Sequence, residues 1–262
     1  MKLFRTTLAV AAIVPVLVAS RVEAATQAWV VSYNYKKLNN TTLVSAAVTQ
    51  DAGDQTYAIQ ERPNNVKVTA PLTNTGGNTR EFFWPASGPD VTDSESCAVW
   101  SKQYAAPGVT TDSITQQGAA LRIVQTPTST RGITVTKNIF FGATWFFNVH
   151  VWDSASNEPF TQLAGFDMSE VMGKMWWDEQ GSLQSNLKPL PWHLCARTVG
   201  NTLKFKVWPD DVTPQPSWND SRYVREVQIP AAWDVPGKAG WYIGHLNPGH
   251  SAEFQGLQTQ YR

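Results

Sequence analysis

The stretch 195–256 limits the possible folds most strongly. It consists of short runs rich in β-branched and aromatic residues, each ended by Gly, Pro, Asn or Asp. This pattern is typical of strands joined by tight turns. Turns are expected at Val199-Gly200-Asn201 and at Asn247-Pro248-Gly249, because glycine accepts a positive φ and proline presets the first corner of a turn. We predict three or four antiparallel strands in this stretch.

The first 24 residues have the pattern of a secretory signal peptide. Lys2 and Arg5 make a basic start, an apolar run follows over 6–20, and Val22-Glu23-Ala24 has the small-x-small form of a cleavage site. The apolar run is shorter than the roughly 20 residues that a membrane-spanning helix needs. We therefore expect a secreted, extracellular protein without a membrane span.

Removing this segment leaves 238 of the 262 residues. It takes away three basic residues and one acidic residue from totals of 21 each, so the net charge becomes about −2. Basic residues form no cluster, which argues against nucleic acid as a partner, because nucleic acid is bound by clustered Lys and Arg. The length suits one all-β domain with a sizeable core, and no repeat or linker divides it. We predict a single domain over 25–262.

Alternating and apolar runs predict further strands before residue 195. They are expected at 29–33, 43–48, 56–60, 66–68, 79–85, 97–104, 119–125, 133–141 and 145–152. Asp167 and Glu170 have the spacing of an N-cap and its capping box, which predicts one short helix through Met172. Among the tryptophans, we expect Trp29, Trp145 and Trp241 to lie in the core.

The strand predicted over 145–152 has two different faces. Alternation places Trp145, Phe147, Val149 and Val151 on one face, and Phe146, Asn148, His150 and Trp152 on the other. The first face is apolar and belongs in the core. The second combines flat rings, which stack on sugars, with polar groups that bind hydroxyls, as in a sugar-binding face. The alternative is a second core face that holds a hydrogen-bonded histidine.

Two further strands show a similar contrast between faces. Alternation separates Trp100 from Cys97 and Val99, and it separates Trp208 from Phe205 and Val207. If the faces with Trp100, His150 and Trp208 line one sheet, they form a concave groove suited to a polysaccharide. Residues 176–179, Trp-Trp-Asp-Glu, are predicted to be a binding loop at the edge of this groove, or else a hydrophobic plug over one end of the fold.

Cys97 and Cys195 are the only two cysteines. In an exported chain an even count indicates a disulfide, and closing a loop of this length contributes about 4–5 kcal/mol in the entropic account. A catalytic thiol is the alternative, and an oxidising compartment disfavours it. The cysteines and four histidines lack the ligand spacing of a zinc site, so we predict no metal ligands from the residues themselves.

Three motifs near the end of the chain carry a resemblance to known proteins. They are Arg197-x-x-Gly200-Asn201-x-Leu203-x-Phe205-Lys206-Val207-Trp208, Gly240-Trp241-Tyr242-Ile243-Gly244 and Ala252-Glu253-Phe254. This part of the chain resembles the concanavalin A-like lectin/glucanase superfamily, in particular its laminin-G-type jelly rolls. The resemblance implies an antiparallel jelly-roll β-sandwich that binds glycans. Because many such proteins carry calcium, it also makes the acidic loop Asp90-x-x-Asp93-x-Glu95 a candidate structural calcium site; a solvated loop is the alternative.

Enzymes of similar fold provide two comparisons. The glucanases place their carboxylates on one strand as Glu-x-Asp-x-x-Glu, a motif that is absent here; Asp93-x-Glu95 is the nearest approach. Jelly-roll alginate lyases carry Arg-x-Glu-Leu-Arg, Gln-x-His and Tyr-Phe-Lys-Ala-Gly strands. This chain is similar at Arg80-Glu81, Asn148-Val149-His150 and Lys204-Phe205-Lys206, but it lacks the second Arg, the Gln and the Ala-Gly. In a lyase, His150 would act as general acid and base.

The sequence therefore predicts a lectin-like protein that binds an extracellular or cell-wall polysaccharide or glycoconjugate. The candidate contact residues are Trp100, Asn148, His150, Trp152, Trp208, Arg80 and Glu81. The first alternative is an enzyme of the same fold that cleaves such a glycan, either a lyase or a glycoside hydrolase. The second is a structural or adhesion protein whose aromatic surface meets a cell-surface protein.

Overall fold

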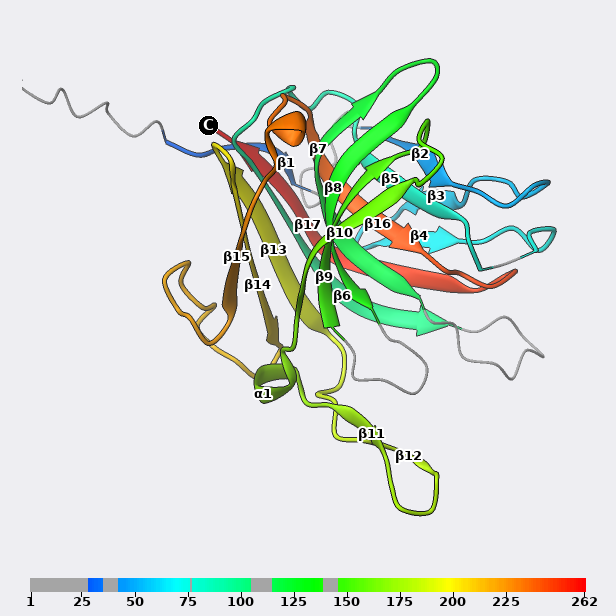
Figure 1. Ribbon diagram of the computed structural model, residues 1–262, viewed down its shortest axis with the longest axis vertical. Coiled ribbons are helices and arrows are strands. Elements are labelled where there is room, and N and C mark those ends of the chain that lie inside the picture. Colours follow the sequence, from blue (N-terminus) through cyan, green and yellow to red (C-terminus); the bar gives the residue numbers. More distant parts are fainter. Residues whose placement is uncertain (1–27, 35–41, 76, 105–114, 139–145) are drawn as a thin grey trace, which may run out of the picture.

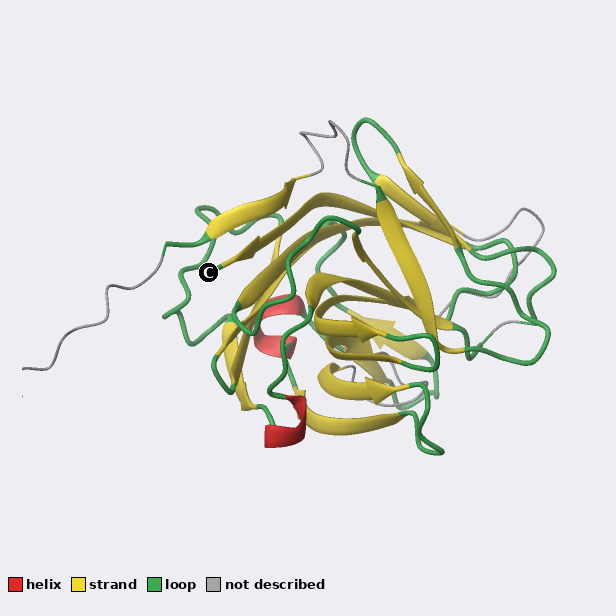
Figure 2. Cartoon of the chain, turned by 90° about the horizontal axis from the view of Figure 1, so that it is seen from above, coloured by secondary structure: helices red, strands yellow, loops and turns green. Residues whose placement is uncertain are grey.

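The computed structural model describes residues 28–34, 42–75, 77–104, 115–138 and 146–262. Within them, two antiparallel sheets pack face to face, and a small hairpin stands apart (Figure 1). Helical structure in these ranges is limited to α1, Ser169–Met172, and a 3-10 turn, Ala231–Trp233 (Figure 2). This confirms the predicted β-sandwich with one short helix. The predicted signal peptide and Trp145 lie outside the described residues.

The larger sheet has eight described strands in the order β15-β14-β13-β6-β17-β4-β3, with β1 pairing beside β4 on β17. Their bounds are β1 Val30–Asn34, β3 Ala58–Glu61, β4 Val66–Thr69, β6 Ser94–Tyr104, β13 Trp192–Val199, β14 Thr202–Pro209, β15 Val224–Gln228 and β17 Ser251–Tyr261. Gly200 turns β13 into β14 with a φ of 53°, as the sequence predicted for that turn.

The smaller sheet has seven described strands in the order β10-β9-β8-β7-β16-β5-β2. Their bounds are β2 Leu43–Thr49, β5 Arg80–Pro85, β7 Gln116–Gln125, β8 Thr130–Asn138, β9 Phe146–Asp153, β10 Phe160–Phe166 and β16 Lys238–Gly244. The sequence pattern did not predict β10, because its exposed edge position removes the alternation that marks a half-buried strand.

The core between the sheets is built from alternate residues of facing strands. Phe147, Val149 and Val151 of β9 are buried there, as predicted, and so is Trp241 of β16. Trp29 is an exception to the expected set. It is half-buried on the outward side of the larger sheet, beside Arg197 and Arg262, so its predicted core position is wrong.

The smaller sheet curls so strongly that its outward face is also packed. Strand β2 contacts β8 although β5, β16 and β7 lie between them in the sheet. Gly132 of β8 shows how tight the curl is, because a Cβ at this position would lie 2.9 Å from the ring of Phe82. The curl encloses a second apolar cluster: Ala46, Val48, Phe82, Trp84, Ala120, Ile123, Trp152 and Tyr242. We call the outward side of this sheet the concave face.

The helix and hairpin lie at one end of the sandwich. Helix α1 forms where predicted, but Met168 occupies the N-cap, and the Asp167 carboxylate accepts a hydrogen bond from the Ser169 amide at 2.8 Å instead of completing a capping box. Strands β11, Met175–Trp177, and β12, Leu183–Ser185, form a hairpin that projects beyond the sheets (Figure 1). Trp176 in this hairpin is 40% exposed, so it does not plug the sandwich.

Candidate functional site

The concave face brings three of the predicted contact residues together with one from a distant strand. Asn148, His150 and Trp152 share this side of β9, and Arg80 extends from the start of β5. The Arg80 guanidinium lies 5.6 Å from the centre of the Trp152 ring, a cation–π distance. The curl of the sheet causes this approach, because β5 and β9 are separated by β16, β7 and β8.

Aromatic rings form the floor and one rim of the site. The Trp152 ring centre lies 5.6 Å from that of Tyr242 and 5.1 Å from that of Phe160. His150 packs edge-on against Phe160 at 5.6 Å. Trp152 and Tyr242 are buried, whereas Phe160 on the edge strand β10 is 46% exposed. Phe160 is therefore the ring that a ligand from solvent meets first.

Two buried polar atoms at this site lack a hydrogen-bond partner within the described structure. They are the amide nitrogen Nδ2 of Asn148 and the ring nitrogen Nδ1 of His150. A buried polar atom without a partner costs about 1–3 kcal/mol, so native proteins keep few of them. Both atoms belong to residues that the sequence singled out as sugar contacts. Their unmet hydrogen-bonding capacity is the strongest local indication of a ligand.

Burial keeps His150 uncharged. Its side chain is 7% exposed, and desolvation, with Arg80 nearby, lowers its pKa to about 4; a hydrogen bond with Gln162 opposes this only in part. His245 behaves in the same way, with a pKa lowered to about 4 by burial and by Arg80. Arg80 Nη2 donates a hydrogen bond to His245 Nε2 at 2.8 Å, which requires that nitrogen to be unprotonated. At neutral pH, Arg80 supplies the positive charge of this region.

Tyr242 is the residue at this site that sequence reasoning missed most clearly. Its hydroxyl lies on the concave face and donates a hydrogen bond to Gln116 Oε1 at 3.0 Å. Burial raises its pKa, so the phenol stays protonated. The signal was present, because Trp241 was placed in the core and alternation then puts Tyr242 on the opposite face. Phe160, Gln162 and His245 gave no comparable signal.

Two predicted contacts point into the protein instead. Trp100 is 0% exposed in the core between the sheets, where it stacks on Phe147 at 5.9 Å, so its prediction as a ligand contact is wrong. The alternation in β6 was correct, but the face with Trp100 is the inward one. Glu81 is also fully buried, and its Oε1 accepts a hydrogen bond from the Tyr57 backbone amide. It therefore makes no part of the concave face.

Trp208 lies on the other sheet. It is on the outward side of β14, where it stacks on His193 with ring centres 5.0 Å apart. The condition for a shared groove, that the faces of Trp208 and His150 line one sheet, is therefore not met. The same holds for the lyase-like match at Lys204-Phe205-Lys206, which also belongs to β14. Pairing places β16 beside β5, and the curl of the sheet brings Tyr242 of β16, not this lysine strand, to Trp152 of β9.

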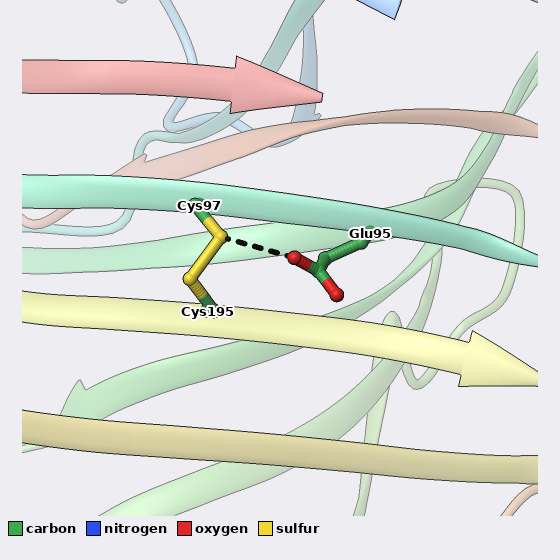
Figure 3. Close-up of side chains that lie close together, drawn as sticks. All are labelled: Glu95, Cys97 and Cys195. Atoms are coloured by element: carbon green, nitrogen blue, oxygen red, sulfur yellow. Dashed lines mark hydrogen bonds between the residues drawn. A yellow bond between two sulfur atoms is a disulfide. The ribbon is translucent and has the colours of Figure 1, made fainter. Parts of the chain in front are cut away.

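The predicted disulfide is present. Cys97 and Cys195 face each other on the neighbouring strands β6 and β13, and their sulfur atoms are bonded at 2.03 Å (Figure 3). Glu95 Oε1 lies 3.5 Å from Cys97 Sγ, so these three side chains have the proximity of a metal-ligand group. The sulfur atoms are bonded to each other and offer no thiolate, which removes two of the three ligands.

The acidic loop that the resemblance made a calcium candidate is held by basic groups. Asp90 pairs with Lys238 at 3.1 Å, and Asp93 pairs with Arg262 at 3.1 Å. Asp93 also accepts a hydrogen bond from the Gly200 amide at 2.8 Å. These contacts favour a structural role in which the loop ties β6 to the β13–β14 turn.

Glu81 gives a testable pH dependence. Burial raises its pKa from an ordinary value of 4.5 to about 7, so its carboxylate disfavours folding increasingly as pH rises from 4.5 to 7 and to a constant extent above that. We expect Glu81→Gln to raise the free energy of unfolding by up to about 3 kcal/mol above pH 7 and to leave it unchanged near pH 4.5. Urea denaturation across this range measures the difference; equal effects at both ends would contradict the assignment.

The same variant removes Glu81 from the pH profile and leaves the two histidines and Glu95, whose pKa is raised by burial, as buried groups that titrate there. Because the pKa values of the histidines are lowered from 6.5 to about 4, their contribution to stability is complete above pH 6.5 and is lost as pH falls toward 4. With Glu81→Gln in place, we expect a stability loss confined to that window. An unchanged profile after both histidines are also replaced by Gln would show that folding does not lower their pKa values.

No family model and no curated protein matches the chain by sequence. By structure it is similar to the CBM2 module of the evolved Dit of Lactobacillus casei BL23 phage J-1, with a TM-score of 0.48 and 11% identity over 89% of this chain and 96% of the module. For the carbohydrate-binding module CBM66 from Bacillus subtilis the values are 0.44, 11%, 82% and 94%. For the alginate lyase from Klebsiella pneumoniae they are 0.42, 9%, 83% and 95%.

At these low identities and TM-scores, we assign neither a family nor an activity from the similar structures. The described helices are also too short or too polar to cross a bilayer. The architecture itself is established by strand pairing: two antiparallel sheets in a jelly-roll-type sandwich, which is the fold that the resemblance to the concanavalin A-like superfamily implied.

Proposed function

We propose that the protein is a secreted, lectin-like, single-domain protein that binds a polysaccharide at the concave face. The observation that carries this proposal is the unpartnered pair of Asn148 Nδ2 and His150 Nδ1 beside the ring of Phe160. Sugars offer hydroxyl groups to such atoms and C–H surfaces to such rings. The signal-peptide pattern of residues 1–24 supports secretion.

The charge states at the site favour binding over chemistry. A general base works best when its pKa lies near the working pH, but the pKa of His150 is lowered to about 4. Tyr242 is shifted the other way and stays protonated. Both groups are therefore neutral hydrogen-bonding partners near pH 7, which suits the recognition of sugar hydroxyls.

His150→Ala tests this proposal. We expect the substitution to weaken polysaccharide binding about five- to tenfold, since it removes a buried polar contact worth about 1–1.5 kcal/mol. Binding is followed by tryptophan fluorescence against a panel of neutral and uronate polysaccharides. His193→Ala is the matched control, because this histidine lies on the other sheet. Retained binding of neutral polysaccharides in His150→Ala would contradict the concave-face site. No fluorescence change with any glycan would contradict glycan binding and favour the adhesion role.

A polysaccharide lyase is the second candidate, favoured by one observation: the Arg80 cation lies beside His150 and Tyr242. A lyase needs a cation to neutralise the uronate carboxylate and a base and acid at the neighbouring carbon. The same panel distinguishes it, because lyase products are unsaturated and absorb in the ultraviolet. If the wild-type protein releases such products from uronate polymers and His150→Ala does not, the function is catalysis and not binding alone.

A further inference from the structure

The outward side of the larger sheet carries a row of charged residues across neighbouring strands. Register places Glu226 of β15, Lys204 of β14, Arg197 of β13 and Glu95 of β6 side by side. Lys204 pairs with Glu226 at 2.8 Å, and Glu95 accepts a hydrogen bond from Gln260 at 2.7 Å. Arg197 differs from its neighbours, because within the described structure it has neither a hydrogen bond nor an ion pair.

Aromatic rings cover Arg197 instead. Its guanidinium lies 4.1 Å from the ring centre of Trp218 and 6.0 Å from that of Trp29. The nitrogen Nε is buried without an acceptor. Aromatic rings attract a cation but do not accept its N–H groups as a carboxylate does, so the hydrogen-bonding capacity of this arginine is unmet. The Nε–H group of Arg197 can therefore donate to an acceptor that the described residues do not supply.

Arg197 opens onto a pocket of about 360 Å³. The remaining lining combines an indole, a hydroxyl, cations and one carboxylate: Trp29, Val199, Thr202, Lys204, Glu226 and Arg262. Arg262 is held by Asp93 at 3.1 Å and Lys204 by Glu226, whereas Arg197 is attracted by its cross-strand neighbour Glu95 without forming an ion pair with it. The pocket lies on the larger sheet, whereas the concave face belongs to the smaller one.

We propose that this Arg197 pocket is a second glycan site, specific for a sugar that carries a carboxylate. The guanidinium binds the carboxylate through two parallel hydrogen bonds, a geometry that arginine provides and lysine does not. The Trp29 ring packs on the sugar, and Thr202 and Glu226 accept hydrogen bonds from its hydroxyls. With the concave face on the other sheet, the protein can then hold two glycan segments at once. The Arg197 site itself does not depend on the proposed function; holding two glycan segments at once rests on it.

The test uses galacturonate and galactose, which differ only in the carboxylate, on the purified protein. We expect galacturonate to shift the Arg197 Nε–H resonance saturably and galactose to do so at least about tenfold more weakly, as expected for loss of a charge-assisted contact. Arg197→Gln should weaken galacturonate binding by a similar factor in calorimetry. Arg222→Gln, which changes a 74% exposed arginine near the same sheet, should not.

Several outcomes would overturn the proposal. They are no saturable shift, equal shifts from both sugars, and an acetate response as strong as that to galacturonate, which would mean that the sugar is not recognised. His150→Ala separates the two sites: it should leave the Arg197 shift intact. An intact Arg197 response with no binding at the concave face rejects only the proposed function. The opposite result rejects only the second site.

Discussion

Replacing Cys97 and Cys195 together by alanine is expected to lower the free energy of unfolding by about 4–5 kcal/mol. The bridge joins residues 98 apart in sequence, and the enclosed loop contains every strand from β7 to β12. Without the cross-link, the unfolded chain gains the freedom that this closure removes, while the folded strands β6 and β13 keep their pairing. Urea denaturation followed by tryptophan fluorescence measures the difference.

Reduction provides the control for this prediction. A reducing agent should destabilise the wild-type protein by the same amount and leave the double variant unchanged. A loss below about 1 kcal/mol would mean that the unfolded chain already keeps these two strands close together, since the entropic account assumes that it does not.

Trp100→Ala is expected to lower the free energy of unfolding by about 3–5 kcal/mol, as for other large aromatic residues removed from a core. The side chain is 0% exposed and packs between Phe147 of β9 and Trp192 of β13, with ring centres 5.9 and 6.3 Å away. Its removal leaves a cavity where the two sheets meet, and a close-packed core closes such a cavity only in part.

Trp176→Ala is the matched control, because Trp176 is 40% exposed on the projecting hairpin and should change stability by less than about 0.5 kcal/mol. The folded fraction of Trp100→Ala should bind glycans as the wild type does. If this variant kept its stability and lost binding, the contact role that the sequence suggested for Trp100 would be restored.

Strand β9 shows what the alternation of side chains along a strand can predict. It correctly separated Phe147, Val149 and Val151 from Asn148, His150 and Trp152, because side chains on a strand point to opposite sides in turn. In β6 the same rule separated Trp100 from Cys97 but did not say which side faces the core. In β9 both faces carry aromatic residues, and in β6 the face with Trp100 also carries Lys102, so composition does not decide the direction.

The candidate site was predicted in part. Asn148, His150 and Trp152 came from one strand, and Arg80 from a loose motif match; the structure places all four on the concave face. Trp208 does not join this site, because the pairing of β14 with β13 and β15 assigns it to the other sheet. Glu81 was wrongly predicted as a contact because it is the next residue after Arg80 and therefore points inward. Tyr242 was missed, although alternation with the core residue Trp241 predicts that it lies on the outward face.

The sequence by itself determined the class of fold, the short helix, the turns at Gly200 and Gly249, and the pairing of its two cysteines. These follow from local rules, namely the strand period, the φ that glycine allows and the count of thiols. Tertiary structure alone decided which strands are neighbours and that the smaller sheet curls until β2 reaches β8. Such long-range contacts join residues far apart along the chain. They brought Arg80 to Trp152 and left Arg197 without a hydrogen-bond acceptor among the described residues.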